Sequence, residues 1–501
     1  MSTPRATQVH SFIGGAFRES RTGEVQVDPI PDPATGETIA LLPYSTTGEI
    51  DEAIGAALGA FPGWADTPVP ERAQVMFRFK QLLEDHFDEL AQLVTRENGK
   101  TLPESKGEVR RAIEVVELAC GAPTLMMGTN LDQIADGIDE ELVRFPVGVV
   151  AGITPFNFPN MVPLWMIPLA IVCGNTFVHK PSQRTPLSAV RIAELLAEAG
   201  LPEGVFNVIH GAKDAVDTLL SHPEVDEVSF VGSATVASYI YARGAAHGKR
   251  VQALGGAKNH LIVMDDADLE KTVTALISSA FGNAGQRCLA GSVAVGVGSL
   301  GDALVKELVE QADRLNVGPG TEPDTDMGPV IREERRKELI GYIEQGEEVG
   351  AALVADGRGV GSSDGFFLGP TIFDRVSPDM RLWKDELFGP ILSVVRAADI
   401  DEAIRVMNSS SYGNAASIFT TSGANAREFK RRAEAGMLGV NIGVAAPMAF
   451  FPFTGWKQSF FGDLHATGTD GVRFYTRQKV VTSRWWLAPK LDHSQPERRG
   501  H

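Results

Sequence analysis

The sequence predicts an α/β protein with mostly parallel sheets, and three observations support this fold class. Short β-branched runs, VGVVAGITPF (147–156) and NTFVHKPS (175–182), each lead into a turn that contains proline. A stretch with helical spacing, LSAVRIAELLAEAG (187–200), follows the second run. Further apolar runs and turns then alternate as far as HLIVMDD (260–266). Apolar strands that alternate with helices are typical of a parallel sheet covered by helices on both faces.

The chain before these strands is predicted to be mainly helical. Apolar and charged residues recur at helical spacing over residues 50–94. A third stretch, residues 104–127, places four apolar side chains on one face: Val109, Ile113, Val116 and Ala119. The most apolar stretch, residues 161–178, is interrupted by proline, glycine and asparagine, so we expect a buried helix followed by a strand and no membrane span.

Two features extend the fold toward the C-terminus. The alternation of strand and helix repeats from about Leu254 to Arg432, which predicts a second α/β unit. The run GVRFYTRQKVVTSRWW (471–486) alternates apolar and charged residues like a strand. Such a strand has no obvious partner within a closed domain, so we expect it at an edge shared with another subunit.

Length, charge and cysteine content limit the kind of protein. A chain of 501 residues is too long for one ordinary core, so two or three domains are expected. The net charge of −18 argues against nucleic acid as a partner, because neutralising a phosphate backbone requires a basic face. Three cysteines make no disulfide framework and have no metal-ligand spacing, which indicates a reducing compartment and no bound metal. With no signal peptide visible, we expect a cytoplasmic protein.

Cys288 is the candidate nucleophile among these cysteines. It lies in FGNAGQRCLAG (281–291), where small residues let the backbone approach a substrate closely. The neighbouring Arg287 is expected to lower the pKa of the thiol, because a cation favours the thiolate. The alternative is a buried, inert cysteine, which is what most free cysteines are. Cys120, in the middle of an expected helix, and Cys173, at the end of a buried run, fit that alternative better.

Three further residues lie at the carboxyl ends of expected strands, where open α/β sheets bind ligands. Asn157, in TPFNFPN (154–160), can donate its amide to a developing oxyanion, although asparagine beside proline is also ordinary in turns. Ser233 opens a helix at a turn where free backbone N–H groups favour a pyrophosphate, but this turn lacks the GxGxxG pattern. Lys180 follows its strand directly and is expected to be exposed.

The order and spacing of six short motifs resemble the aldehyde dehydrogenase superfamily over nearly the whole chain. They are PFNFP (155–159), KPS (180–182), FVGS (230–233), LGG (254–256), GQRC (285–288) and ELFGP (386–390). The resemblance implies two α/β domains with mostly parallel sheets and a small oligomerisation sheet, in a homodimer or homotetramer. The expected NAD-binding domain covers residues 8–122 and 147–253, the catalytic domain residues 254–452, and the oligomerisation strands residues 123–146 and 470–488.

The resemblance also implies roles for the matched residues. Cys288 is the expected nucleophile, and its backbone N–H forms the oxyanion hole together with the side chain of Asn157. Lys180 and Ser233 are expected to hold the adenosine ribose and the pyrophosphate of NAD. Glu386 and Phe388 are expected to position the nicotinamide ribose and ring. The expected cofactor contacts are Thr154, Phe156, Lys180, Gln183, Ser233, Glu386 and Phe388.

One residue departs from the superfamily's common pattern. Hydrolytic members carry a glutamate just before LGG as the general base that activates water, and here that residue is Ala253. Asp463 lies near a second acidic position of some members, but the local spacing differs. Coenzyme A needs less help than water, because a thiol is intrinsically nucleophilic. Long stretches such as KRVQALGGAKNH (249–260) resemble the methylmalonate-semialdehyde dehydrogenase branch, which acylates coenzyme A.

That branch oxidises an aldehyde bearing a carboxylate, and a carboxylate favours a bidentate cation. Arg287 and Arg111 are its expected partners, with Arg110 less well placed, and the alternative for Arg111 is a solvated charge on a helix face. The implied reaction turns methylmalonate or malonate semialdehyde into propionyl-CoA or acetyl-CoA with loss of CO2. Gln183 stands where NAD-preferring relatives often have glutamate, so NADP is expected to be a weaker alternative to NAD.

Three alternatives remain at this point. A hydrolytic semialdehyde dehydrogenase would release a free acid with some other group as the base. A non-catalytic protein would keep the fold alone, although it need not keep Cys288, Asn157, Lys180 and Glu386 together. Acylation without oxidation is disfavoured by the residues expected around the nicotinamide.

Overall fold

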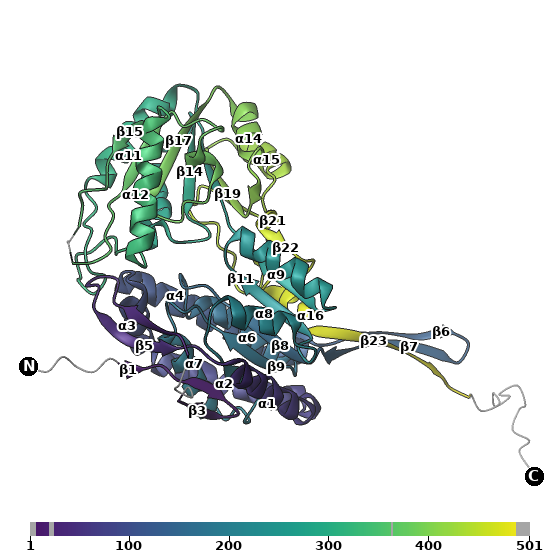
Figure 1. Ribbon diagram of the computed structural model, residues 1–501. Helices are drawn as coiled ribbons and strands as arrows, with labels where there is room; N and C mark the ends of the chain where they lie inside the picture. The colour runs from purple at the N-terminus through teal and green to yellow at the C-terminus, as the bar shows by residue number, and fades with distance from the viewer. Residues whose placement is uncertain (1–6, 20–24, 362–363, 487–501) are drawn as a thin grey trace, which may run out of the picture.

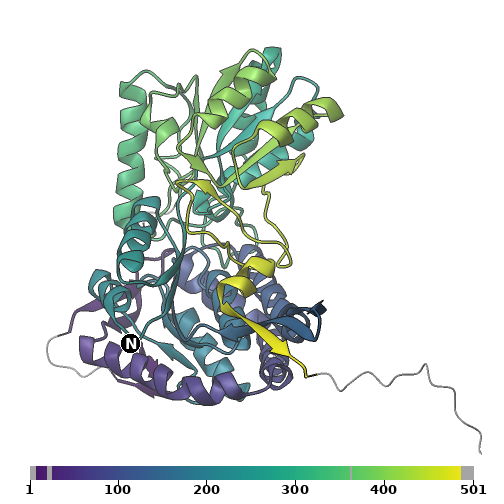
Figure 2. The ribbon, with the colours of Figure 1, turned by 90° about the vertical axis from the view of Figure 1, so that its right-hand side faces the viewer.

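The computed structural model describes residues 7–19, 25–361 and 364–486. It contains two α/β units, one above the other in Figure 1, and a narrow sheet that projects from the lower unit. Figure 2 shows the same stacking from the side. The fold class predicted from the sequence is therefore confirmed. Among the described residues, no helix is long and apolar enough to cross a membrane.

The lower unit is built on an eight-stranded sheet with the order β22-β12-β11-β8-β9-β10-β2-β3. Its five central strands are parallel: β8 (Val149–Ile153), β9 (Thr176–Lys180), β10 (Phe206–Val208), β11 (Glu227–Val231) and β12 (Arg250–Leu254). The outer strands are β22 (Phe460–Phe461) at one edge and β2 (Ser11–Ile13) with β3 (Ala16–Arg18) at the other. A separate small sheet contains β1 (Thr7–Gln8), β4 (Val27–Pro31) and β5 (Thr38–Pro43). The helices of this unit are α1 (Thr47–Asp66), α2 (Val69–Asp85), α3 (Phe87–Asn98), α4 (Leu102–Cys120), α5 (Ala122–Leu125), α6 (Met161–Val172), α7 (Leu187–Glu198), α8 (Lys213–Ser221) and α9 (Ala234–Ala246).

The upper unit repeats the scheme around a seven-stranded sheet. The order is β15 (Ala352–Ala355), β16 (Thr371–Asp374), β17 (Ile391–Ala397), β14 (Gly291–Val297), β13 (Asn259–Val263), β19 (Ala415–Phe419) and β20 (Met437–Val440). Every neighbouring pair is parallel except β15 with β16. Its helices are α10 (Leu269–Phe281), α11 (Gly301–Ala312), α12 (Glu333–Glu348), α13 (Arg381–Lys384), α14 (Ile400–Asn408) and α15 (Gly423–Arg432). Short 3-10 turns, η1 (Gly282–Gly285) and η2 (Gly298–Leu300), and a two-stranded sheet of β18 (Tyr412–Gly413) and β21 (Trp456–Lys457) complete it.

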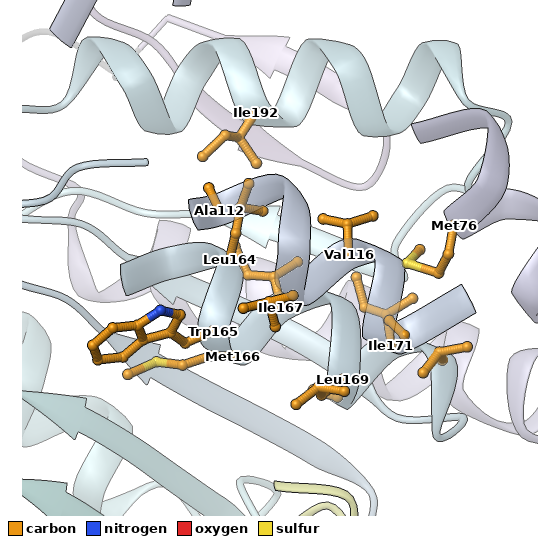
Figure 3. Packing of buried hydrophobic residues seen from close by; sticks show 14 of the residues in the cluster. Met76, Ala112, Val116, Leu164, Trp165, Met166, Ile167, Leu169, Ile171 and Ile192 are labelled. Carbon is orange, nitrogen blue, oxygen red and sulfur yellow. The ribbon is translucent and has the colours of Figure 1, made fainter. Parts of the chain in front are cut away.

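Helices α4 and α6 pack against each other in the apolar core of the lower unit. Residues 162–172 of α6 are all buried, and Figure 3 shows Leu164 and Ile167 beside Ala112 and Val116 of α4. The four apolar residues predicted on one face of α4 are at most 1% exposed, so that prediction is confirmed. Cys120 is the last residue of α4 and does not lie mid-helix as expected.

The third sheet corrects the expectation for the closing strand. It contains β6 (Thr129–Ala135), β7 (Ile138–Pro146) and β23 (Thr476–Arg484), in the order β23-β7-β6. The first residues of the closing run belong instead to a helix, α16 (Gly468–Phe474). β23 pairs with β7 along its whole length, because the 129–146 hairpin leaves the unit beside it and offers a free edge. The strand therefore has a partner in its own chain, and a role in oligomerisation remains a prediction. Residues 487–488 of the predicted segment lie outside the described residues.

Candidate active site

Cys288 follows a tight turn that the sequence places at the end of α10. Asn283 and Ala284 have φ values of 52° and 50°, a left-handed conformation that costs energy for residues with a side chain. Gly285 continues the turn with φ 69°, and a Cβ there would lie 2.1 Å from the carbonyl oxygen of Gly389. The backbone N–H of Asn283 donates to Glu104 of α4 at 2.6 Å. Helix α4 therefore supports the turn that presents the cysteine.

Asparagine amides hold the backbone on both sides of the cysteine. The carbonyl of Gln286 accepts from Nδ2 of Asn157 at 3.0 Å. The carbonyl of Cys288 accepts from Nδ2 of Asn259 at 2.9 Å and of Asn414 at 2.8 Å. Because an amide carries two N–H groups, Asn157 can hold this loop and still donate to an oxyanion. The structure thus brings together the two sides of the predicted oxyanion hole.

Two cavities meet at Cys288, which lines both. The first, of about 300 Å³, is lined by α4 and the 444–453 segment, and it includes Arg111 and Arg287. The second, of about 350 Å³, includes five residues predicted around the cofactor and the oxyanion: Phe156, Asn157, Ser233, Glu386 and Phe388. A nucleophile between two cavities suits a reaction in which an aldehyde lies on one side and a hydride acceptor on the other.

The second cavity fits a nicotinamide dinucleotide. Ser233 is the N-cap of α9, and backbone N–H groups at a helix start favour a pyrophosphate. Oε1 of Glu386 accepts from the backbone N–H of Ala257 at 2.9 Å. A Cβ on Gly256 would lie 2.3 Å from the other carboxylate oxygen of Glu386, so the glycine of LGG makes room for this side chain. The ring of Phe388 meets that of Phe156 edge-on at 5.8 Å.

Three of the residues predicted to bind the cofactor do not line this cavity. Lys180 ends β9, but it is 5% exposed and its Nζ donates to the carbonyl of Gly211 at 2.9 Å, so the expectation that it is exposed was wrong. The turn that contains Gly211 covers it, and burial lowers its pKa to about 8. Thr154 is buried, with its hydroxyl 2.9 Å from Nε2 of His179. Gln183 is half-buried in the turn after β9. Their expected cofactor contacts remain predictions.

Burial controls the acidity of the nucleophile. The pKa of Cys288 is raised to about 12, first by burial and then by the nearby Glu386, whereas Arg287 lowers it. The expected net lowering by Arg287 was therefore wrong, because desolvation outweighs the cation. Nη2 of Arg287 donates to the carbonyls of Ser278 and Ser279 near the end of α10. Burial likewise raises the pKa of Glu386 to about 7.

Arg111 faces the same cavity as Cys288. Its guanidinium donates to Glu114 at 2.7 Å, to the sulfur of Met448 at 2.8 Å and to the carbonyl of Pro447. It is therefore not a solvated charge on a helix face. Arg110 is exposed and pairs with a carboxylate of α2, away from the cavity.

No carboxylate stands in the position of the hydrolytic base. Ala253 is fully buried in β12, paired in register with Phe230 of β11 and Phe461 of β22, and Asp463 is exposed beyond β22. In the described part of the chain, the carboxylates that line the two cavities are Glu104, Glu108, Glu114, Glu338 and Glu386. Each already accepts a hydrogen bond from an N–H group.

Comparison with known proteins decides the family. The model of the aldehyde dehydrogenase family matches residues 19–481. The chain belongs to this family. A malonate-semialdehyde dehydrogenase of Geobacillus kaustophilus is 58% identical over 477 residues, 95% of this chain and 98% of the relative. The malonate-semialdehyde dehydrogenase of Halalkalibacterium halodurans is 54% identical over 479 residues, with the same shares covered.

Solved structures of the family have the same fold. Methylmalonate-semialdehyde dehydrogenase from Oceanimonas doudoroffii is 50% identical, with a TM-score of 0.94 over 96% of this chain and 99% of that one. A putative methylmalonate-semialdehyde dehydrogenase from Sinorhizobium meliloti, complexed with NAD, is 44% identical, with a TM-score of 0.95 over 97% and 99%.

Three residues that line the first cavity were not predicted from the sequence: Lys100, Glu104 and Glu108. A local signal exists for Glu104, because Thr101 and Glu104 form the capping box of α4, a pattern visible in the sequence. Lys100 and Glu108 carry no such signal. They appear at the site only because α4 crosses beneath the turn that bears Asn157.

Removal of the Glu386 charge should make Cys288 more reactive toward iodoacetamide. At pH 8 Glu386 is largely ionised, since its pKa is about 7, and it opposes the thiolate. Glu386→Gln should raise the alkylation rate at pH 8 by less than about tenfold, because burial is the larger cause of the raised thiol pKa. At pH 6 the two proteins should converge. Peptide mass spectrometry of Cys288 measures this, with Asp385→Asn as the control. Equal rates at pH 8 would contradict the assigned electrostatics.

Proposed function

We propose that this protein oxidises malonate semialdehyde or methylmalonate semialdehyde with NAD and transfers the acyl group to coenzyme A. The acyl group also loses CO2, so the product is acetyl-CoA or propionyl-CoA. The observation that carries the proposal is Ala253 at the position of the hydrolytic base, together with a cavity lined by both Arg111 and Cys288. The names of the relatives support the substrate, and the NAD complex of the Sinorhizobium meliloti protein supports the cofactor.

Attack on the aldehyde uses the residues where the two cavities meet. The deprotonated sulfur of Cys288 adds to the aldehyde carbon, and the oxyanion accepts from Nδ2 of Asn157 and the backbone N–H of Cys288. NAD supplies the acceptor for the hydride when it is bound in the second cavity. Collapse of the adduct expels the hydride and leaves a thioester on Cys288. The thiol proton leaves to solvent, so the step balances as thiol plus aldehyde plus NAD to thioester plus NADH plus a proton.

The substrate carboxylate explains the loss of CO2. Arg111 holds this group in the first cavity, where it competes with Glu114 for the guanidinium. Cleavage of the bond to the carboxylate carbon leaves an electron pair that the thioester carbonyl delocalises. The donors that held the oxyanion stabilise this enolate, and a proton from solvent replaces CO2.

The acyl acceptor follows from the missing base. Water attacks a thioester efficiently only when a general base takes its proton, and a methyl group at position 253 cannot do so. The thiol of coenzyme A supplies its own thiolate near neutral pH. Transfer to coenzyme A therefore needs no residue at that position.

Product identification tests the function. With semialdehyde, NAD and coenzyme A, mass spectrometry should find acyl-CoA in an amount equal to the NADH formed, and Cys288→Ala should form neither. Without coenzyme A, NADH formation should stop after about one equivalent per site. A rate and product indifferent to coenzyme A would instead support the hydrolytic alternative. Acyl transfer to coenzyme A from an acyl thioester, with no NADH formed from the aldehyde, would support acylation without oxidation, and an inactive wild type would support a non-catalytic protein.

Replacement of Arg111 should lower kcat/KM mainly for substrates that carry a carboxylate. Arg111→Ala should lower kcat/KM for malonate semialdehyde by about tenfold to a hundredfold, the value of a lost charge-assisted pair. Propionaldehyde, which lacks the carboxylate, should change much less. Arg110→Ala is the matched control on the exposed side of α4. Equal losses for both aldehydes would show that Arg111 does not bind the carboxylate.

NADP should be a weaker cofactor that is still used. Gln183 removes a carboxylate that would repel a 2′-phosphate, and the adjacent Arg184 is half-buried in the same turn. Steady-state kinetics should give a higher kcat/KM with NAD and a measurable value with NADP. No turnover with NADP would overturn this expectation.

A further inference from the structure

A buried ion pair lies under the turn that bears Asn157. Nζ of Lys100 is 2.6 Å from Oε2 of Glu108, and the two side chains are 1% and 0% exposed. Lys100 stands just before α4, and Glu108 lies in the second turn of that helix. Both line the cavity that contains Cys288.

Each partner also holds the backbone of this turn. Nζ of Lys100 donates to the carbonyl of Asn157 at 2.6 Å and lies 4.1 Å from the ring centre of Phe158. Oε1 of Glu108 accepts from the backbone N–H groups of Asn160 at 2.8 Å and Met161 at 3.1 Å. These N–H groups open α6, so Glu108 caps that helix from α4. The ion pair thus fixes the 157–161 turn at both ends.

Helix α4 also holds the turn that precedes Cys288, whose backbone N–H is the other donor of the proposed oxyanion hole. Glu104, one turn before Glu108, accepts from the backbone N–H of Asn283 in the strained turn before Cys288. The amide of Asn157 and the backbone N–H of Cys288 come from different α/β units, yet both turns are hydrogen-bonded to α4.

We propose that Lys100 and Glu108 are positioning residues that aim the amide of Asn157 at the oxyanion formed on Cys288. This inference rests on the role proposed above for Asn157. Burial alone does not require the pair, because apolar residues of similar size often replace a buried ion pair with no loss of stability. What apolar residues cannot supply is the donor to the Asn157 carbonyl and the cap of α6.

A double-mutant cycle tests the positioning role. Lys100→Met/Glu108→Leu should lower the rate of the first NADH burst about tenfold to a hundredfold, while the KM for the aldehyde stays close to the wild-type value. In an Asn157→Ala background the same double change should cause little further loss, because it acts through Asn157. The midpoint of thermal unfolding should fall, because three backbone groups lose their hydrogen-bond partners, but the variant should remain folded at the assay temperature. The same substitutions in the exposed pair Lys306 and Glu310 of α11 are the control.

Two results would overturn the inference: an unchanged burst rate in the double variant, or losses that add to that of Asn157→Ala. If the double variant does not fold, Glu108→Gln, which keeps an acceptor for α6 but removes the charge, undergoes the same cycle with the same outcomes. Failure of the role proposed for Asn157 is distinguishable, because Asn157→Ala alone would then leave the burst unchanged, and failure of transfer to coenzyme A is seen in the products and not in the burst.

Discussion

The hydrogen bonds between α4 and two separate turns are the constraint on which the site depends. Cys288 follows a helix of the upper unit, and Asn157 follows a strand of the lower one. Oxyanion stabilisation requires their donors to converge within about an ångström or less, because such donors act only at hydrogen-bond distance. Glu104 and Glu108, one turn apart on α4, supply this register through backbone N–H groups of the two turns.

Partial burial of the site also shifts the pKa values of its groups. Away from bulk water each donor to an oxyanion is worth more, but the same desolvation opposes a thiolate and a carboxylate. The raised pKa values of Cys288 and Glu386 are therefore two results of one cause. Arg111, half-buried in a cavity that Cys288 also lines, already binds Glu114, so the substrate carboxylate proposed above would exchange one ionic partner for another.

Local pattern predicted most of the framework and the reacting groups. Apolar runs gave the parallel strands of both units, and the motifs around Cys288 and Asn157 gave residues that the structure places together. The errors concern interactions distant in sequence. The exposure of Lys180 depends on a turn that contains Gly211, the pairing of β23 depends on a hairpin more than three hundred residues earlier, and the acidity of Cys288 depends on desolvation. The role of Lys100 and Glu108 could not be predicted from the sequence for the same reason, because their partners are backbone atoms of a different segment.

The proposed mechanism depends most on what removes the acyl group from Cys288. Ala253 leaves water without a base in the position that hydrolytic relatives use. The most direct measurement is intact-protein and peptide mass spectrometry after mixing the enzyme with semialdehyde and NAD in the absence of coenzyme A. We expect an acyl group on Cys288 that persists after the NADH burst has ended and disappears when coenzyme A is added. An acyl enzyme that decays equally fast with and without coenzyme A, with release of free acid, would contradict the account.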